Sequence, residues 1–236
     1  MREAKAGAAY GAHAMRRVAC IALALAAGLS AQVAREANSG YQTEEQRKKL
    51  AAGLGNPERD QTVKPETLVR EMGLEPGMTV ADIGTGVGFM LPYLSKAAGP
   101  GGHVIAEDIF DDFLAAAKLK AAQAGLANVQ FIKGTETDPR LPDRSLDMAL
   151  VLDVYHHFDY PEKMLAAIHR ALKDGGKLIV VEYYKRESAM PNGRALTHIR
   201  LDMPDVIKEV EANHFHLLEE KERVRDVQYM LMLEKN

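Results

Sequence analysis

The feature that most constrains this chain is a short apolar stretch, Val80–Ile83, that runs directly into a turn with glycine at every second position, Gly84 to Gly88. Glycine lets a backbone turn tightly and approach a ligand where any Cβ atom would collide. An acidic residue, Asp108, follows twenty residues after the last of these glycines. At the end of the next strand of a parallel sheet, a carboxylate at about this spacing accepts hydrogen bonds from both hydroxyls of a ribose. The two features together predict a nucleoside cofactor.

Strand and helix patterns alternate over the middle of the chain. Strands are expected over 79–83, 103–107, 128–132, 146–152 and 177–184, and helices over 89–98, 110–124 and 161–172. Alternation of this kind builds a parallel sheet with helices on both faces. After a helix expected over 204–213, the strands expected at 214–219 and 226–234 have no helix between them, so they should pair antiparallel. We therefore expect an α/β, doubly wound, mostly parallel seven-stranded sheet with an antiparallel C-terminal strand.

The first residues are typical of a secretory signal peptide. Met15-Arg16-Arg17 precedes an uncharged apolar run, Val18–Leu29, and the small or polar residues Ser30-Ala31-Gln32 follow. The run is too short for a typical membrane span. We therefore expect export to the periplasm or cell envelope and no stable membrane span after cleavage. The alternatives are a cytoplasmic protein and a start at Met15 in place of Met1.

Composition excludes several partners and chemistries. The formal net charge is −3, tryptophan is absent, and no basic stripe is present, so nucleic acid is not an expected partner. The one cysteine, Cys20, lies inside the apolar run of the signal-like segment. The remainder of the chain therefore has no thiol for a disulfide, a metal site or a nucleophile.

The glycine spacing separates two kinds of nucleoside cofactor. The dinucleotide fingerprint is G-x-G-x-x-G, and its last position would fall on Phe89, whereas this chain has G-x-G-x-G. The stretch VADIGTGVG (80–88) resembles the first motif of the class I S-adenosylmethionine-dependent methyltransferases. GGHVIAEDI (101–109) resembles their ribose-binding strand, and 134–158 and 168–182 resemble their fourth and fifth strand regions. The similarity is closest to the small-molecule branch that includes quinone and sterol methyltransferases.

This resemblance implies S-adenosyl-L-methionine as the cofactor and a three-part chain. The parts are a signal-like segment (1–31), an N-terminal extension or lid (32–64) and a methyltransferase domain (65–236). The glycine turn would approach the methionine portion of the cofactor, with Asp82 beneath it fixing the loop. The turn residues implied to bind the cofactor are Gly84, Thr85, Gly86 and Gly88.

The resemblance also implies contacts to the nucleoside. Asp108 would hold the ribose hydroxyls, and Ile109 would pack on the adenine. Relatives often carry an acid for the adenine amino group where this chain has Thr135, followed by Glu136. Either of these two residues is a candidate substitute. Asp153, after the fourth strand, would face the junction of cofactor and substrate.

The implied activity is in-line methyl transfer to oxygen, carbon or nitrogen of a small-molecule acceptor. A neutral acceptor must also lose a proton, which requires a base. The candidate catalytic residues are Tyr155, His156 and His157, with Glu182 or His198 from later loops as further bases. A histidine is suited because it titrates near neutrality. The His156-His157 pair also has a purely structural interpretation.

No metal site is expected from the sequence. Asp153 with Glu182 would suit magnesium, but no adjacent Asp-Asn pair follows the fifth strand. His214 and His216 share one face of a late strand, which we interpret as a solvated face.

Two other classes of protein stay open. One is a nicotinamide-dependent oxidoreductase, which the glycine spacing disfavours, and the other is a noncatalytic cofactor-binding or scaffold protein.

Overall fold

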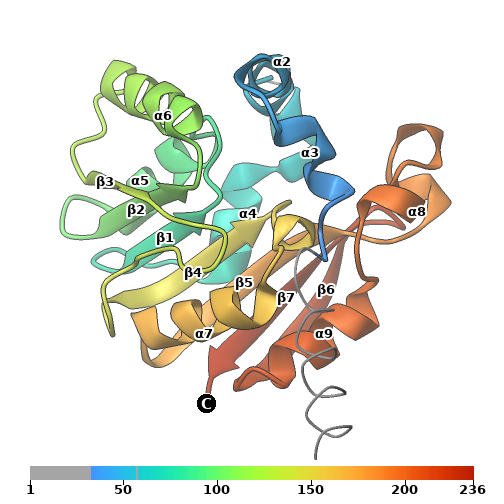
Figure 1. Cartoon of the computed structure of the whole chain (residues 1–236). Coiled ribbons are helices and arrows are strands. Elements are labelled where there is room, and N and C mark those ends of the chain that lie inside the picture. Colours follow the sequence, from blue (N-terminus) through green and yellow to red (C-terminus); the bar gives the residue numbers. More distant parts are fainter. Residues whose placement is uncertain (1–32, 57) are drawn as a thin grey trace, which may run out of the picture.

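A computed structural model describes residues 33–56 and 58–236, so the expected signal-like segment (1–31) lies outside the described residues. Seven strands of this part of the chain form one sheet in the order β3-β2-β1-β4-β5-β7-β6 (Figure 1). Their bounds are β1 Thr79–Ile83, β2 His103–Asp108, β3 Val129–Lys133, β4 Leu146–Leu152, β5 Leu172–Tyr183, β6 Phe215–Val224 and β7 Gln228–Lys235.

The strand directions confirm the expected fold class. The pairs β1–β2, β1–β4, β2–β3 and β4–β5 are parallel. The last strand, β7, lies antiparallel between β5 and β6. The chain leaves β1 toward β2 on one side and later returns to add β4 on the other side. This change of direction is the switch point at which parallel sheets bind ligands beyond the carboxyl ends of their strands.

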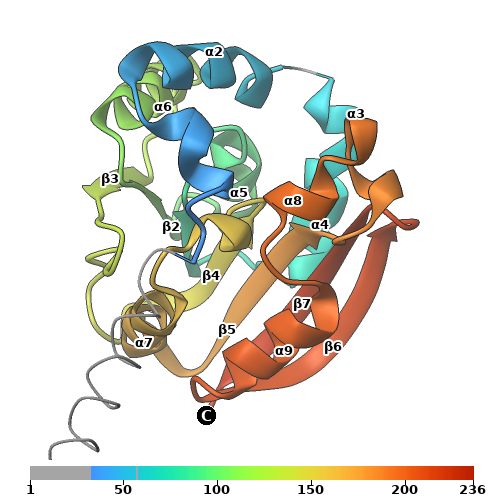
Figure 2. The same cartoon turned by 45° about the vertical axis from the view of Figure 1, so that its right-hand side comes forward.

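Helices cover both faces of the sheet, as Figures 1 and 2 show from two sides. The helices α4 (Pro65–Met72), α5 (Leu91–Ala98) and α6 (Asp111–Gln123) pack on one face, and α7 (Pro161–Ala171) and α9 (Met203–Glu211) pack on the other. Successive strand residues point to opposite faces. Val80 accordingly packs on the face covered by α4, α5 and α6, and Ala81 packs on the face covered by α7 and α9. Burial on both faces explains the nearly continuous apolar sequence of β4.

Some element boundaries differ from the expected ones for local reasons. The helix α5 begins at Leu91, and not at Phe89, because the glycine turn continues through Gly88 in a left-handed conformation. The strand β6 continues to Val224 through charged residues that were expected to form a turn. It lies at the edge of the sheet, where charged side chains reach solvent and discourage pairing with other chains. The strand β5 starts at Leu172, and its register to β4 is irregular before Lys177.

Residues 37–63, which we call the cover, form three short helices over the carboxyl ends of the strands (Figures 1 and 2). These are η1 (Ala37–Tyr41), α2 (Glu44–Leu54) and α3 (Arg59–Val63). The expected capping box is present, since Thr43 and Gln46 bond reciprocally at the start of α2. Four further short helices follow β4 and β5: η2 (Tyr155–His157), η3 (Glu187–Ala189), η4 (Pro191–Gly193) and α8 (Ala195–His198). Within the described residues, no helix combines the length and the apolar character needed to cross a bilayer.

Candidate active site

The glycine turn after β1 has a backbone that only glycine adopts without strain. Gly84, Gly86 and Gly88 have φ angles of 68°, 56° and 77°. A Cβ atom at Gly84 would lie 2.6 Å from Cγ1 of Val154, and one at Gly88 would lie 2.8 Å from Cδ1 of Leu91. Gly88 therefore serves the packing of the turn on α5, whereas the turn from Gly84 to Gly86 faces a pocket.

Buried acids hold this turn from below. The Thr85 hydroxyl donates to Asp82 at 2.7 Å. The Gly86 amide donates to Asp108 at 2.9 Å, and the Phe110 amide donates to the other oxygen of the same carboxylate at 2.9 Å. Burial is the main cause that raises the pKa of both Asp82 and Asp108 to about 6. Both carboxylates are ionised above that pH, so they accept hydrogen bonds from the turn and from donors in the pocket.

Glu107 is a third buried acid that the sequence analysis missed. Its Oε2 atom accepts a hydrogen bond from the Gly84 amide at 3.3 Å, and its Oε1 atom is buried without a partner. A Cβ atom at Gly134 would overlap the Glu107 carboxyl group, so glycine is required there. Burial raises the pKa of Glu107 well above its usual range. The side chain is among those that line the pocket.

Asp153 follows β4 in a left-handed conformation, with φ of 56°. Its two oxygens accept from the Gln228 amide at 2.9 Å and from the Arg59 guanidinium at 3.1 Å. Burial raises the pKa of Asp153 to about 6, while the charge of Arg59 lowers it. A non-glycine residue in this region stores strain, which structures tend to keep at functional positions. Arg59 was not expected at the site, because it lies 94 residues away in the cover.

These groups surround a pocket of about 280 Å³ between the sheet and the cover. Most residues implied by the resemblance line it: Asp82, Gly84, Thr85, Gly86, Asp108, Ile109, Thr135, Glu136 and Asp153. Gly88 is not among the lining residues. Asn38, Tyr41, Leu54 and Arg59 of the cover complete the wall. The hydroxyl of Thr135 bonds the backbone of Asp138, which leaves Glu136 as the freer of the two adenine candidates.

The structure separates the three candidate bases. Tyr155 is 1% exposed and donates its hydroxyl to Glu209 at 2.6 Å, away from the pocket. His156 is buried, and its Nδ1 lies 2.6 Å from Glu182. Only His157 lines the pocket, and its Nδ1 lies 2.7 Å from Oδ1 of Asn38. Burial lowers the pKa of His157 well below its usual value, so the ring is neutral at physiological pH.

The residues present fit S-adenosylmethionine. The turn from Gly84 to Gly86 gives close access to backbone, Asp108 supplies an ionised acceptor at the end of β2, and aromatic and aliphatic side chains surround both. A doubly wound sheet with this strand order and a G-x-G-x-G turn at its switch point is the arrangement that the resemblance to class I S-adenosylmethionine-dependent methyltransferases implies. Residues 81–180 carry a methyltransferase domain, and S-adenosylmethionine is its cofactor.

Comparisons with known proteins agree with this class. Residues 81–180 match the family model described as "Methyltransferase domain". The chain is 32% identical over 123 residues to a ubiquinone/menaquinone biosynthesis C-methyltransferase UbiE of Marinomonas sp., which covers 52% of this chain and 49% of that protein. The chain thus spans about half the length of the curated relatives it matches.

Solved structures show the same fold. A SAM-dependent methyltransferase from Aquifex aeolicus superposes with a TM-score of 0.74 at 29% identity, covering 80% of this chain and 98% of that one. The [4+2]-cyclase SpnF superposes with a TM-score of 0.61 at 19% identity, covering 72% and 79%. The second likeness concerns the fold alone, and it illustrates that one fold serves more than one reaction. The matched family model, the UbiE relative and the Aquifex aeolicus structure are methyltransferases, which disfavours the alternative of a nicotinamide-dependent oxidoreductase.

Proposed function

We propose that this protein transfers a methyl group from S-adenosylmethionine to oxygen, carbon or nitrogen of a small, largely apolar molecule. The observation that carries the proposal is the enclosure of the pocket by the cover. Leu54 and Arg59 border it from above, and the rings of Tyr41, Phe110 and Phe113 contact one another at its wall. An enclosed, mostly apolar pocket with a few polar groups is typical of small-molecule sites.

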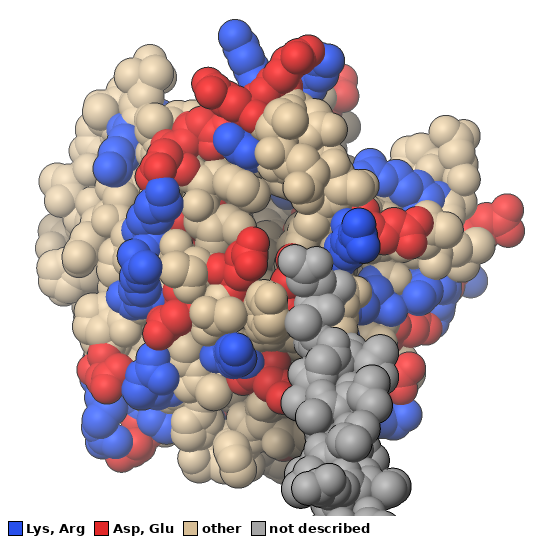
Figure 3. All heavy atoms as spheres, viewed as in Figure 1, with Lys and Arg blue, Asp and Glu red and all other residues tan. Residues whose placement is uncertain are grey.

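The surface supports a small acceptor over a nucleic acid. On the face in Figure 3, lysine and arginine side chains are interspersed with aspartate and glutamate. A nucleic-acid partner would need a continuous basic surface to neutralise phosphates. The relatives named as ubiquinone/menaquinone biosynthesis C-methyltransferases point in the same direction, toward an acceptor of the quinone class.

The residues beneath the cover would bind S-adenosylmethionine and the acceptor. Bound S-adenosylmethionine supplies a methyl group on a sulfonium, which is an excellent leaving group, so the protein needs mainly to align the acceptor and exclude water. Asp108 would accept hydrogen bonds from the ribose hydroxyls. Ile109 would contact the adenine, and Glu136 would accept from its amino group. Arg59 holds Asp153 and closes the pocket above it.

His157 is the candidate base for an acceptor that must lose a proton. Asn38 donates its amide nitrogen to the His157 carbonyl and to Asp159, both at 3.0 Å, so its Oδ1 faces the imidazole Nδ1. This network assigns the proton of the neutral ring to Nδ1 and leaves the lone pair on Nε2. A neutral imidazole with a free Nε2 beside the pocket can accept a proton.

We also propose that residues 32–64 act as a lid that opens for ligand exchange, and that the protein is exported. The lid is supported by the position of the cover across the pocket. Export is supported by the sequence of the first 31 residues, and its alternative is a cytoplasmic protein. N-terminal sequencing of the natively expressed protein separates the two, because an intact Met1 or Met15 in the cytosol would exclude cleavage.

Methyl transfer from labelled S-adenosylmethionine to a metabolite extract tests the function. We expect label in small molecules, much less label with Asp108→Ala at a cofactor concentration that does not saturate this variant, and slower labelling with His157→Gln. Tyr160→Phe, outside the pocket wall, is the matched control and should label like the wild type. Binding of S-adenosylhomocysteine without transfer to any extract would instead favour a noncatalytic cofactor-binding protein.

A further inference from the structure

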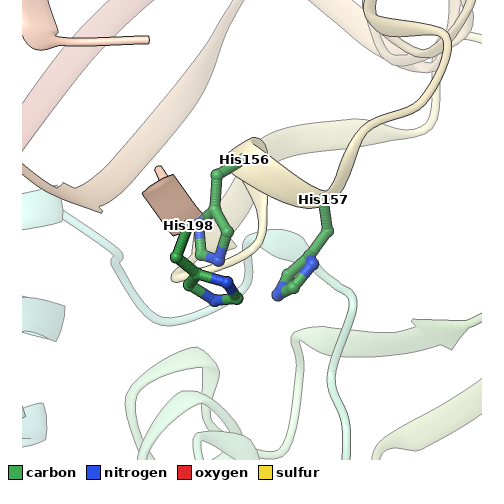
Figure 4. Close-up of side chains that lie close together, drawn as sticks. All are labelled: His156, His157 and His198. Atoms are coloured by element: carbon green, nitrogen blue, oxygen red, sulfur yellow. The ribbon is translucent and has the colours of Figure 1, made fainter. Parts of the chain in front are cut away.

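Three histidines gather beside the pocket, apart from the residues that hold the glycine turn. His156 and His157 come from η2, and His198 comes from α8, and Figure 4 shows the three rings directed toward one another. One ring nitrogen from each residue lies within 4.8 Å of the other two. The ring centroid of His156 lies 4.0 Å from that of His157 and 4.8 Å from that of His198.

The hydrogen bonds around this cluster fix where the lone pairs are. Glu182 accepts from both the backbone amide and Nδ1 of His156, at 3.2 and 2.6 Å, so the ring proton is on Nδ1. The Nε2 atom of His156 is buried and has no partner. Asn38 fixes His157 in the same way. Two imidazole lone pairs are therefore held next to each other, and neither has a donor among the residues described.

We propose that His156, His157 and His198 bind a divalent transition metal ion of the Zn²⁺ type. An unpaired buried acceptor is costly, and a cation between the rings would satisfy all three nitrogens at once. The outer partners also fit, because metal-binding histidines commonly donate their second ring N–H to a carboxylate or a carbonyl oxygen. Glu182 and Asn38 occupy those two positions for His156 and His157.

Closing the site requires a small movement. Zinc–nitrogen bonds of about 2.0–2.1 Å in a tetrahedral site place the nitrogens roughly 3.4 Å apart. A separation at the 4.8 Å limit would therefore have to shorten by about 1.4 Å. His198 is the residue to move, since it is only partly buried on the four-residue helix α8. The Arg194 guanidinium lies 3.4 Å from both ring nitrogens of His198 and would have to turn aside. Arg194 is exposed, so it can do so toward solvent.

Three histidine ligands leave a fourth position free for water or a substrate atom. Because His157 lines the pocket, that position lies beside the region assigned to the acceptor. Nε2 of His157 cannot bind the ion and accept a proton at the same time, so the role of base assigned to it above belongs to the metal-free chain. The metal site does not rest on methyl transfer: its binding test gives the same answer whether or not an acceptor is ever methylated.

The test uses the untagged full chain, stripped with a chelator and dialysed, and titrated with Zn²⁺ by calorimetry. We expect one bound ion per chain, and we expect Co²⁺ in its place to show the visible absorption of a tetrahedral site. His198→Gln should weaken Zn²⁺ binding about 100-fold, and Glu182→Gln should weaken it about 10- to 100-fold. Arg194→Ala should strengthen it, because it removes a positive charge next to the ion.

His169 and His214 provide the matched control. Their rings lie 6.0 Å apart elsewhere in the fold, and no third histidine of the described residues forms a metal-binding group with them. His169→Gln should leave Zn²⁺ binding unchanged. Circular dichroism of each variant reports whether it is folded, and Arg194→Ala gives a gain that misfolding does not produce. Absence of stoichiometric Zn²⁺ binding by the wild-type chain, or equal binding by His198→Gln, overturns the proposal and leaves the three rings as a packing cluster.

Discussion

The two sides of the pocket are built in different ways. One side, which we call the floor, comprises the turn from Gly84 to Gly88 with Asp82, Glu107 and Asp108. It is fixed by buried strands and by hydrogen bonds from its own backbone amides. The other side is the cover. It is held by side-chain contacts to distant residues, such as Arg47 to Asp112 at 2.8 Å and Arg59 to Asp153 at 3.1 Å.

We infer from this difference that the floor recognises the cofactor and that the cover opens for ligand exchange. A floor built into the sheet offers the same geometry at all times, which suits a cofactor common to a whole class of enzymes. A cover joined by a few partly exposed ion pairs opens at a lower free-energy cost than the sheet, because such segments lie at the low-stability end of a protein.

Changing the floor at Gly84 should be the most damaging substitution. Gly84→Ala places a Cβ atom against Val154 and forces a left-handed conformation on alanine. Strain and overlap together should lower the free energy of unfolding by about 2–4 kcal/mol. Gly53→Ala in α2, where a Cβ atom meets nothing within 4 Å, is the matched control and should be neutral or stabilising. Urea unfolding measures both, and equal stabilities would show that the floor is not tightly packed.

Removing the acid of the floor should weaken the cofactor without unfolding the chain. Asp108→Ala deletes the acceptor for the ribose hydroxyls and for the Gly86 amide. Loss of charged hydrogen bonds of this kind costs about 1.5–3 kcal/mol, or roughly 10- to 150-fold in the dissociation constant of S-adenosylhomocysteine. Calorimetry provides the constant. Asp111→Ala, an exposed neighbour paired with Lys133, is the control, and an equal loss there would show that the wrong acid is assigned.

Removing the ion pair between Arg59 and Asp153 should make the cover more mobile and leave the floor unchanged. Arg59→Gln removes the cation beside Asp153, and the protonation of Asp153 limits the cost to the fold. We expect amide exchange in α2 and η1 to accelerate about tenfold, which corresponds to about 1.4 kcal/mol, while exchange in β1 and β4 stays unchanged. Lys49→Gln is the control in the same segment, since its ion pair with Glu45 is exposed. Faster exchange throughout the sheet would contradict a separately moving cover.

The smallest effect concerns pH. Burial raises the pKa of Asp108 to about 6, and ribose hydroxyls bind its ionised form. Affinity for S-adenosylhomocysteine should therefore be constant above pH 7 and fall as the pH drops through 6, by about tenfold per unit for one proton. Asp108→Asn cannot titrate and should lose this part of the dependence. An identical profile in that variant would assign the titration to Asp82 or Asp153, whose pKa values are raised similarly.

The sequence predicts the floor far better than the cover. The apolar period of β1 and the glycines after it are local patterns, and Asp108 lies at a spacing set by one βαβ unit. The contacts of the cover join residues 119 apart for Asn38 and His157 and 94 apart for Arg59 and Asp153. No local pattern encodes such pairs, because they depend on how the whole chain closes. For the same reason, the sequence does not predict that His198 lies close to His156 and His157.

Glu107 shows a second limit of the sequence. Two adjacent acids at the end of a strand must point to opposite faces. The sequence alone does not show that both faces of the sheet are buried at this position. It also does not show that Gly134 leaves room for the Glu107 side chain. An acid next to the ribose-binding acid, combined with a glycine at the end of the following strand, is the signal that would have indicated it.

The most direct test of the account is a crystal structure of the full chain with S-adenosylhomocysteine. We expect the ribose hydroxyls to donate to the Asp108 carboxylate and the sulfur to lie over the turn from Gly84 to Gly86, on the side of Asp153 and His157. The account would be contradicted by crystals, grown with saturating ligand, in which the nucleoside contacts neither Asp108 nor the glycine turn.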